Sequence, residues 1–236
     1  MDFNKHYFPL ESNPEVFTDL LERLGTAADL EFQDVLSLDD PTLLPPSTLA
    51  LVLILPTSES FELKKTLEDT HVPDHTGRMG RSEICWFKQT INNACGLYAI
   101  LHGICNTEAA SMLRSDSILR ILLDECDAKD PTQCARILEA SDSIEDAYNL
   151  ASARSQSVAP QSAEEEVDLH YICFVQHGQR LIELDGDRKG PIDRGSSAPG
   201  MLRHDALKAI REYVEAEAGD LRFNVMALVR LTSRCS

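Results

Sequence analysis

The chain has 236 residues, 43% of them hydrophobic, which is enough apolar content to bury the core of one large domain or two small ones. Its formal net charge is −17, from 39 acidic and 22 basic residues, and no basic run exceeds two residues, so we expect no nucleic-acid interface. The longest apolar run, residues 49–55, has the length of a strand, so we expect no membrane span.

The seven cysteines argue against a disulfide framework. Their number is odd, no Cys-x-x-Cys pair occurs, and the chain starts without a signal-peptide pattern. We therefore expect reduced thiols and a location in the cytoplasm or the nucleus. Because cysteine and histidine are scattered singly, we expect no metal site and no cofactor.

The first half of the chain predicts a helix followed by short strands. Ser12 or Asn13 can cap a helix that has Pro14 in its first turn and ends at Gly25. A strand is expected at 32–35, a central strand buried on both faces at 49–55, a polar loop at 69–82, and a short strand at 84–87.

The second half mixes helices with strands. Helices are expected from about 95, and at about 115–126, 131–140, 141–150 and 200–217; strands are expected at 169–175, 180–185 and 223–229. Because the pattern lacks a regular alternation of strand and helix, it predicts an α+β fold around a largely antiparallel sheet.

Residues 151–166 form an irregular polar segment with one large apolar residue, Val158. Sixteen such residues are more than a usual connection inside a compact domain, so the segment is either a linker between domains or a loop that gates a site. The chain after residue 166 is too short to build its own core. We therefore favour a gating loop within a single domain that spans 1–236.

Cys95 stands where a polar stretch, residues 89–93, runs into an apolar helical segment. A thiol at a helix N-terminus is close to free N–H groups and to the positive end of the helix dipole, which favour the reactive thiolate. The alternative is a buried structural cysteine, which is the commoner fate of this residue type. This segment alone does not decide between them.

A cysteine nucleophile needs a base, and the base needs an orienting group. If the hairpin of 169–185 turns between His177 and Gly178, paired residue numbers sum to 355 and His170 lies opposite Asp185. The alternatives are a structural histidine in a sheet and an ordinary Asp-Gly turn. Gln89, six residues before Cys95, can supply an amide donor to an oxyanion, or can simply be a polar residue before a helix.

These motifs resemble those of the ubiquitin C-terminal hydrolases, a family of cysteine deubiquitinases. The segments that carry the resemblance are Gln89-Thr90-Ile91, Asn93-Ala94-Cys95-Gly96, Asp168-Leu169-His170-Tyr171-Ile172, and Leu184-Asp185-Gly186 followed by Pro191-Ile192. The resemblance spans nearly the whole chain, and the run Gly-Leu-Tyr-Ala-Ile-Leu-His after Cys95 is closest to fungal members. It implies a papain-like fold with a knotted chain path.

The resemblance also implies the roles of individual residues. Cys95 would be the nucleophile, His170 the general base and acid, Asp185 the orienting carboxylate and Gln89 part of the oxyanion hole. Residues 151–166 would be the crossover loop over the active site. Substrate contacts would come from Pro9, Leu10, Glu11, Asn13, Arg222 and Phe223.

The function expected from this resemblance is cleavage after the C-terminal glycine of ubiquitin or a close ubiquitin-like protein, by a monomer that needs no cofactor. Because the crossover loop closes over the site, we expect small or unfolded leaving groups. The acidic surface suits a partner with a basic tail. We also expect the chain to lack the C-terminal extension of larger relatives. The alternatives are a catalytically silent ubiquitin-binding module and a redox-sensing thiol protein.

Overall fold

The computed structural model describes residues 3–26, 29–80, 83–154, 162–165, 167–217, 220 and 222–231. Its helices are α1 (Pro14–Leu24), α2 (Glu59–Asp69), α3 (Cys95–Cys105), α4 (Ile118–Cys126), α5 (Pro131–Glu139), α6 (Asp142–Ser152) and α7 (Leu202–Ala216), with short 3-10 turns at Pro41–Leu43 and Glu108–Met112. Its strands are β1 (Lys5–His6), β2 (Leu30–Asp34), β3 (Thr48–Pro56), β4 (Ile91–Asn92), β5 (Leu169–His177), β6 (Arg180–Leu184), β7 (Ile192–Ser196) and β8 (Asn224–Arg230).

A six-stranded sheet in the order β2-β8-β3-β5-β6-β7 forms the centre of the molecule, and every pairing in it is antiparallel. A separate parallel pair joins β1 to β4. The prediction of an α+β fold around a largely antiparallel sheet is therefore confirmed. The knotted chain path stays a prediction.

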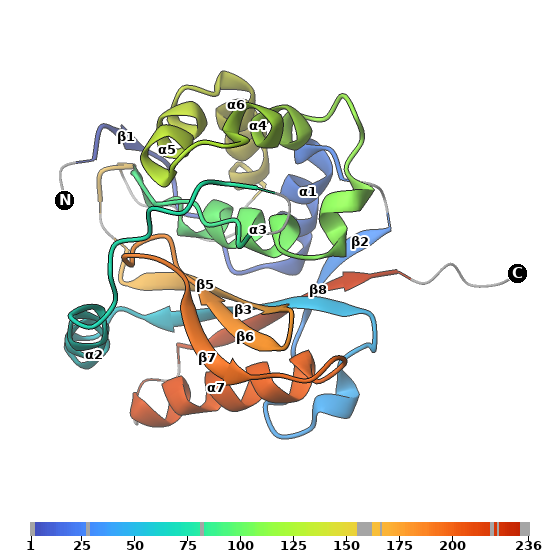
Figure 1. Ribbon diagram of the computed structural model, residues 1–236, viewed down its shortest axis with the longest axis vertical. Coiled ribbons are helices and arrows are strands. Elements are labelled where there is room, and N and C mark those ends of the chain that lie inside the picture. The colour runs from blue at the N-terminus through green and yellow to red at the C-terminus, as the bar shows by residue number, and fades with distance from the viewer. Residues whose placement is uncertain are drawn as a thin grey trace, which may run out of the picture.

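Helices cover both faces of this sheet. Helices α1, α3, α4, α5 and α6 lie on one side, α7 lies on the other, and α2 stands beside one end of the sheet (Figure 1). Strand β3 shows the reason, because its alternate side chains enter two different cores: Ala50, Val52 and Ile54 pack on one side and Leu51, Leu53 and Leu55 on the other.

The helix boundaries follow the capping residues. Asn13 accepts a hydrogen bond from the Glu15 amide at 2.9 Å, and Gly25 ends α1 at a φ of 97°, a conformation that glycine adopts without strain. Asp130 caps α5 with a complete capping box, and Ser141 caps α6. The sequence therefore located these three helices correctly.

The expected strand at 84–87 is wrong. Three of its backbone groups bond to side chains of α3 and of the residue after it, and not to a neighbouring strand. The Cys85 N–H donates to Asn106 Oδ1 at 2.8 Å, the Cys85 carbonyl accepts from Asn106 Nδ2 at 2.8 Å, and the Phe87 N–H donates to His102 Nε2 at 3.0 Å. These hydrogen bonds hold residues 85–87 against the side of α3.

Within the described residues, no helix has both the length and the apolar character that crossing a bilayer requires.

Candidate functional site

Cys95 is the first residue of α3, as the sequence predicts. The residue before it, Ala94, offers no side-chain cap, so the first amides of the helix are not satisfied in that way. Gly96 allows the helix start to approach the N-terminal segment closely, because a Cβ there would lie 3.2 Å from Leu10 Cδ1 and 3.3 Å from Phe17 Cζ. The thiol is thus held at a helix terminus that favours an anion.

His170 and Asp185 meet, but not in the register expected. The β5–β6 pairing runs Cys173 with Leu184 and His177 with Arg180, so paired numbers sum to 357 and the turn residues are Gly178 and Gln179. A shift of two residues keeps side chains on the same face of the sheet, whereas a shift of one would not. His170 Nε2 and Asp185 Oδ1 are therefore still 2.7 Å apart, across a diagonal.

Cys95, His170 and Asp185 lie close together. Asp185 Oδ1 contacts Nε2 of the His170 ring, and the Cys95 thiol is near enough to raise the pKa of that imidazole. Burial opposes the charged imidazolium, but the Asp185 carboxylate and then Cys95 outweigh it and hold the pKa of His170 well above its usual value. Burial likewise opposes the charge on Asp185, and the His170 contact keeps the pKa of that carboxyl low.

Gln89 is bonded to the turn that follows Asp185. Its backbone N–H donates to the Gly186 carbonyl at 2.8 Å, and its Nε2 donates to the Ile91 carbonyl at 3.3 Å. A side-chain amide carries two N–H donors, so one remains for another acceptor. Gln89 is nearly buried, at 8% exposure, so a substrate oxygen that reached it would do so in a largely dry environment.

The two segments expected to contact substrate lie side by side. Asn224 Nδ2, at the start of β8, donates to Ser12 Oγ at 2.7 Å and so ties residues 222–224 to residues 9–14. Arg222 is half-exposed and forms ion pairs with Asp168 at 2.6 Å and with Asp220 at 2.8 Å.

The expected contact residues differ in exposure. The Leu10 side chain is buried, and its carbonyl accepts from Tyr171 Oη at 2.8 Å. Pro9, Glu11 and Phe223 are partly exposed, and Asn13 serves as the cap of α1.

Much of the predicted crossover loop, residues 155–161 and 166, lies outside the described residues. Its described end contacts the turn that precedes the nucleophile. Asn93 Nδ2 donates to the carbonyls of Ala163 and Glu165, each at 2.9 Å. Asn93 has a φ of 57°, in the left-handed region, which asparagine tolerates better than most residues. No sequence pattern predicted a role for this side chain.

Trp86 was also not singled out from the sequence. Its Nε1 donates to the Asp185 carbonyl at 3.0 Å, and its ring packs edge-on against His75 with centroids 5.7 Å apart. Trp86 is the only tryptophan of the chain, and its position three residues before Gln89 is the one sequence signal that could have pointed to this role.

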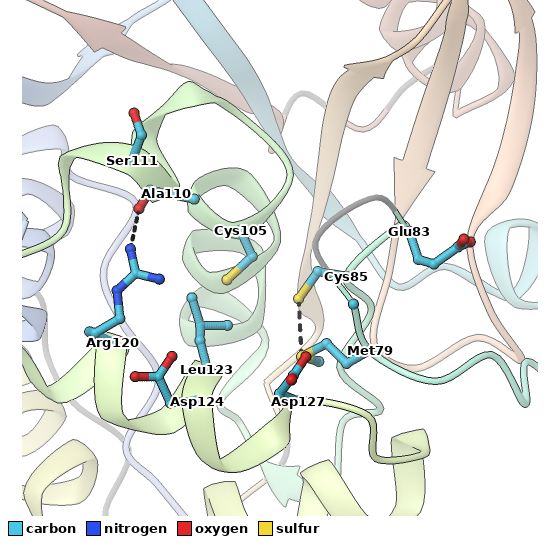
Figure 2. Close-up of a pocket in the computed structure, with 11 residues that line it drawn as sticks. Met79, Glu83, Cys85, Cys105, Ala110, Ser111, Arg120, Leu123, Asp124 and Asp127 are labelled. Carbon is cyan, nitrogen blue, oxygen red and sulfur yellow. Dashed lines mark hydrogen bonds between the residues drawn. The ribbon is translucent and has the colours of Figure 1, made fainter. Parts of the chain in front are cut away.

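A separate pocket of about 660 Å³ opens at the far end of α3, where Cys85 and Cys105 line it (Figure 2). Its other walls come from Met79, Gly80, Glu83, Ala110, Ser111, Arg120, Leu123, Asp124 and Asp127. Ten helical residues separate Cys105 from Cys95, a span of about 15 Å, so this pocket is not part of the site described above.

Comparisons with known proteins agree with the geometry. A family model described as "Ubiquitin carboxyl-terminal hydrolase, family 1" matches residues 7–215. The chain is 34% identical over 232 residues to ubiquitin carboxyl-terminal hydrolase 3 of Arabidopsis thaliana, covering 97% of this chain and 96% of that one. It is 31% identical over 226 residues to the human ubiquitin carboxyl-terminal hydrolase isozyme L1, covering 94% and 97%.

Among solved structures, the Trichinella spiralis UCH37 catalytic domain bound to ubiquitin vinyl methyl ester has a similar fold. The TM-score is 0.75, the sequence identity is 21%, and 97% of each chain is covered.

Proposed function

The chain belongs to family 1 of the ubiquitin carboxyl-terminal hydrolases, and from this membership we infer that it cleaves after the C-terminal glycine of ubiquitin or a close ubiquitin-like protein. It is a cysteine-type thiol hydrolase, and we propose ubiquitin or a ubiquitin-like protein as its partner. The observation that carries the inference is the buried contact of His170 with Asp185 beside a cysteine at a helix start.

In the proposed reaction, His170 takes the proton of Cys95 and the thiolate attacks the carbonyl carbon of the terminal glycine. Asp185 holds the imidazole and stabilises its charged form. Gln89 and the Cys95 N–H donate to the oxyanion of the tetrahedral intermediate. His170 then returns its proton to the leaving group, and water releases the acyl-enzyme.

We propose one catalytic domain over residues 1–236, with residues 151–166 as the crossover loop. A single sheet whose two faces carry the two apolar cores supports one domain. The contacts of Asn93 with Ala163 and Glu165 support a loop that passes close to the nucleophile.

The substrate would lie along residues 9–13 and 222–223, because those two segments are joined beside the start of α3. For location we propose the cytoplasm, with the nucleus as a second compartment. The six cysteines of the described residues are all free thiols, which suits a reducing environment.

A ubiquitin probe with an electrophile at its C-terminus tests this function directly. We expect one probe molecule per enzyme, with the mass shift mapped to Cys95, and no adduct on the variant Cys95→Ala. That variant should still bind ubiquitin, because it loses only the sulfur.

The matched control is Cys105→Ala, which removes the thiol at the other end of α3 and should leave the adduct unchanged. Binding of ubiquitin without any adduct on the unaltered enzyme would instead indicate a catalytically silent module. An adduct on another cysteine would refute the assignment of the nucleophile.

A further inference from the structure

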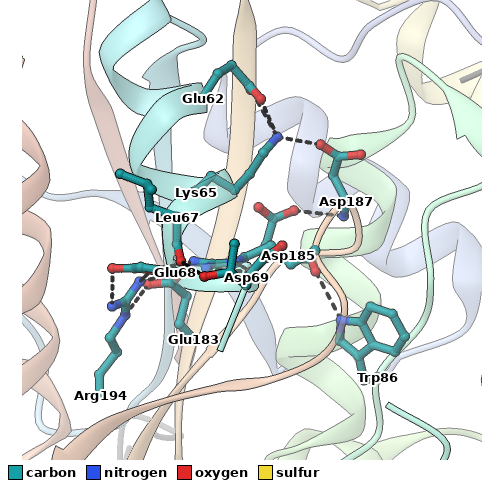
Figure 3. Close-up of polar contacts among 12 residues, drawn as sticks. Glu62, Lys65, Leu67, Glu68, Asp69, Trp86, Glu183, Asp185, Asp187 and Arg194 are labelled. Carbon is teal, nitrogen blue, oxygen red and sulfur yellow. Dashed lines mark hydrogen bonds and ion pairs between the residues drawn. The ribbon is translucent and has the colours of Figure 1, made fainter. Parts of the chain in front are cut away.

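One face of α2 lies against the catalytic residues. Phe61 and Lys65 are four residues apart, so they project from the same side of the helix. The Phe61 ring is buried, and its centroid lies 6.4 Å from that of His170. Lys65, one turn further along, reaches toward the turn after Asp185 (Figure 3).

The Lys65 ammonium is enclosed by its partners. Its Nζ lies 2.6 Å from Asp187 Oδ2 and 2.8 Å from a carboxylate oxygen of Glu62, and its side chain is only 12% exposed. Burial opposes the charge, but Asp187 and Glu62 outweigh it and raise the pKa of Lys65. The group therefore stays an ammonium, and the link to Asp187 is a charged hydrogen bond whose lysine end is largely shielded from water, while the Asp187 side chain is 32% exposed.

Asp187 connects Lys65 to the carboxylate of Asp185. Its backbone N–H donates to Asp185 Oδ1 at 2.9 Å, and that same oxygen lies 2.7 Å from His170 Nε2. Asp185 Oδ2 has no hydrogen-bond partner within the described part of the chain. The orientation of the carboxylate therefore depends on the two partners of Oδ1, and one of them is the residue that Lys65 holds.

We propose that Lys65 is a positioning residue for the hydrolase reaction: through Asp187 it fixes the turn that aims the Asp185 carboxylate at His170. The other side of the turn is already fixed, because Trp86 Nε1 holds the Asp185 carbonyl and the Gln89 N–H holds the Gly186 carbonyl. On the remaining side, Arg188 ties the turn to Glu68 and Asp69 of α2, and Lys65 supplies the restraint on Asp187 itself. In the part of the chain that the structure describes, Lys65 contacts Glu62, Asp187 and the Phe61 ring and not Cys95, so it acts through Asp185.

The inference rests on the proposed function and is tested by comparing Lys65→Met with Lys64→Met. Lys64→Met is the matched control, because it removes the same charge from the same helix. The Lys64 Nζ lies 4.7 Å from the centre of the Tyr213 ring and not on the turn. Both variants are assayed on ubiquitin with a fluorogenic group at its C-terminus.

We expect Lys65→Met to lower kcat about tenfold, within the range that small displacements of catalytic groups cause. We expect KM to change less than about twofold, because no substrate contact is lost. Lys64→Met should match the unaltered enzyme.

Three further measurements separate positioning from a general loss of stability. Lys65→Arg keeps the ion pair and should recover most of kcat. Asp187→Asn should resemble Lys65→Met, and the double variant should be no worse than either single one, because both break one link. The rate at which iodoacetamide alkylates Cys95 should fall in Lys65→Met, because a poorly oriented imidazole forms less thiolate.

An unchanged kcat for Lys65→Met in an active enzyme overturns the proposal, as does a rise in KM alone or a double variant whose losses multiply. If the unaltered protein cleaves no ubiquitin substrate, the proposed function fails instead. The alkylation rate of Cys95 then still decides the role of Lys65, because that assay uses no ubiquitin.

Discussion

Two buried histidines, His170 in the site and His102 beside it, have pKa values shifted in opposite directions. His170 touches Asp185 and has a raised pKa, whereas His102, whose Nε2 accepts the Phe87 N–H at 3.0 Å, has a pKa lowered by burial to about 4. The Asp185 charge also favours a charged His102, but burial outweighs it. At the residue scale, then, a direct carboxylate contact distinguishes the proposed catalytic histidine, His170, from the buried His102.

The state of His102 predicts a loss of stability in acid. Its pKa is lower in the folded chain than the unfolded value near 6.5, so it stabilises the fold fully above about pH 6.5 and loses that contribution as the pH falls through about 4. In His102→Gln, which keeps an acceptor for the Phe87 N–H but does not titrate, the fall in the free energy of unfolding over this range should be smaller by about 3 kcal/mol.

Urea unfolding at a series of pH values measures this difference. His204→Gln, which removes an exposed histidine, is the control and should follow the unaltered chain. Parallel curves for His102→Gln and the unaltered chain would contradict a neutral, buried His102.

At the element scale, the sequence predicts those helices and strands whose apolar residues recur with a regular period. Helix α1 buries one face and strand β3 buries both, so their apolar patterns are clear. Helix α2 was missed because Phe61 is its only buried residue, while Leu63 and Leu67 are exposed, so no apolar stripe marks it. Apart from the packing of Phe61, ion pairs of Lys65, Glu68 and Asp69 hold the helix in place, and pairing of charges more than a hundred residues apart has no local signature.

Strand β7 and the hairpin register were missed for related reasons. Strand β7 lies at the sheet edge and its sequence, Ile-Asp-Arg-Gly-Ser, holds a single apolar residue. Gly178 and Gln179 form the hairpin turn, where the sequence favoured His177 and Gly178. The choice of turn sets the register, and several turns fit the same residues. The His170–Asp185 contact is nevertheless predicted correctly, because the error was an even number of residues.

The turn after β6 packs tightly against the segment that carries Gln89. A Cβ on Gly186 would lie 3.0 Å from Gln89 Cβ, 3.1 Å from the Gln89 N and 3.1 Å from the Phe87 carbonyl oxygen. Two of these atoms are backbone and cannot move alone. Gly186→Ala should therefore displace the amide donor and lower kcat by roughly tenfold or more.

The control is Gly80→Ala, where the nearest atom, Glu83 Cγ, is 4.0 Å away. Steady-state kinetics on the fluorogenic ubiquitin substrate measures both variants. Equal kcat values for the two would show that Gln89 does not depend on this close packing.

The proposed crossover loop gives a prediction about leaving groups. An insertion of about ten Gly and Ser residues within 155–161 should allow larger adducts to reach Cys95, because a longer flexible loop spans a wider opening. We expect a gain of activity on diubiquitin and unchanged cleavage of the fluorogenic substrate.

The same insertion at Gly178, in the hairpin turn between β5 and β6, lengthens a loop elsewhere and should bring no gain. Gel analysis of diubiquitin cleavage compares the two. No gain at 155–161, or an equal gain at both places, would contradict a gating role.

At the scale of the whole molecule, charge is the dominant property. A net charge of −17 on 236 residues produces a negative field that extends beyond any single contact. Such a field accelerates the approach of a partner with a basic tail but does not change the bond-breaking step. Its effect should therefore depend on ionic strength and appear in association only.

We expect kcat/KM for ubiquitin substrates to fall as the ionic strength rises from about 0.01 M to about 0.15 M, because the screening length shrinks from about 30 Å to about 8 Å. The value of kcat should stay constant. Alkylation of Cys95 by uncharged iodoacetamide is the control and should not respond to salt. A kcat/KM that is independent of salt would show that the field plays no part in recognition.

Trp86 is bonded to the turn after β6 through the Asp185 carbonyl, and it is the only tryptophan of the chain. All indole fluorescence of the protein therefore comes from a residue that touches this turn. Its emission is an intrinsic optical reporter of the turn and needs no attached dye. In rising denaturant, a shift in emission that tracks the loss of activity and precedes the loss of circular dichroism would reveal local opening of the turn while the sheet is still intact.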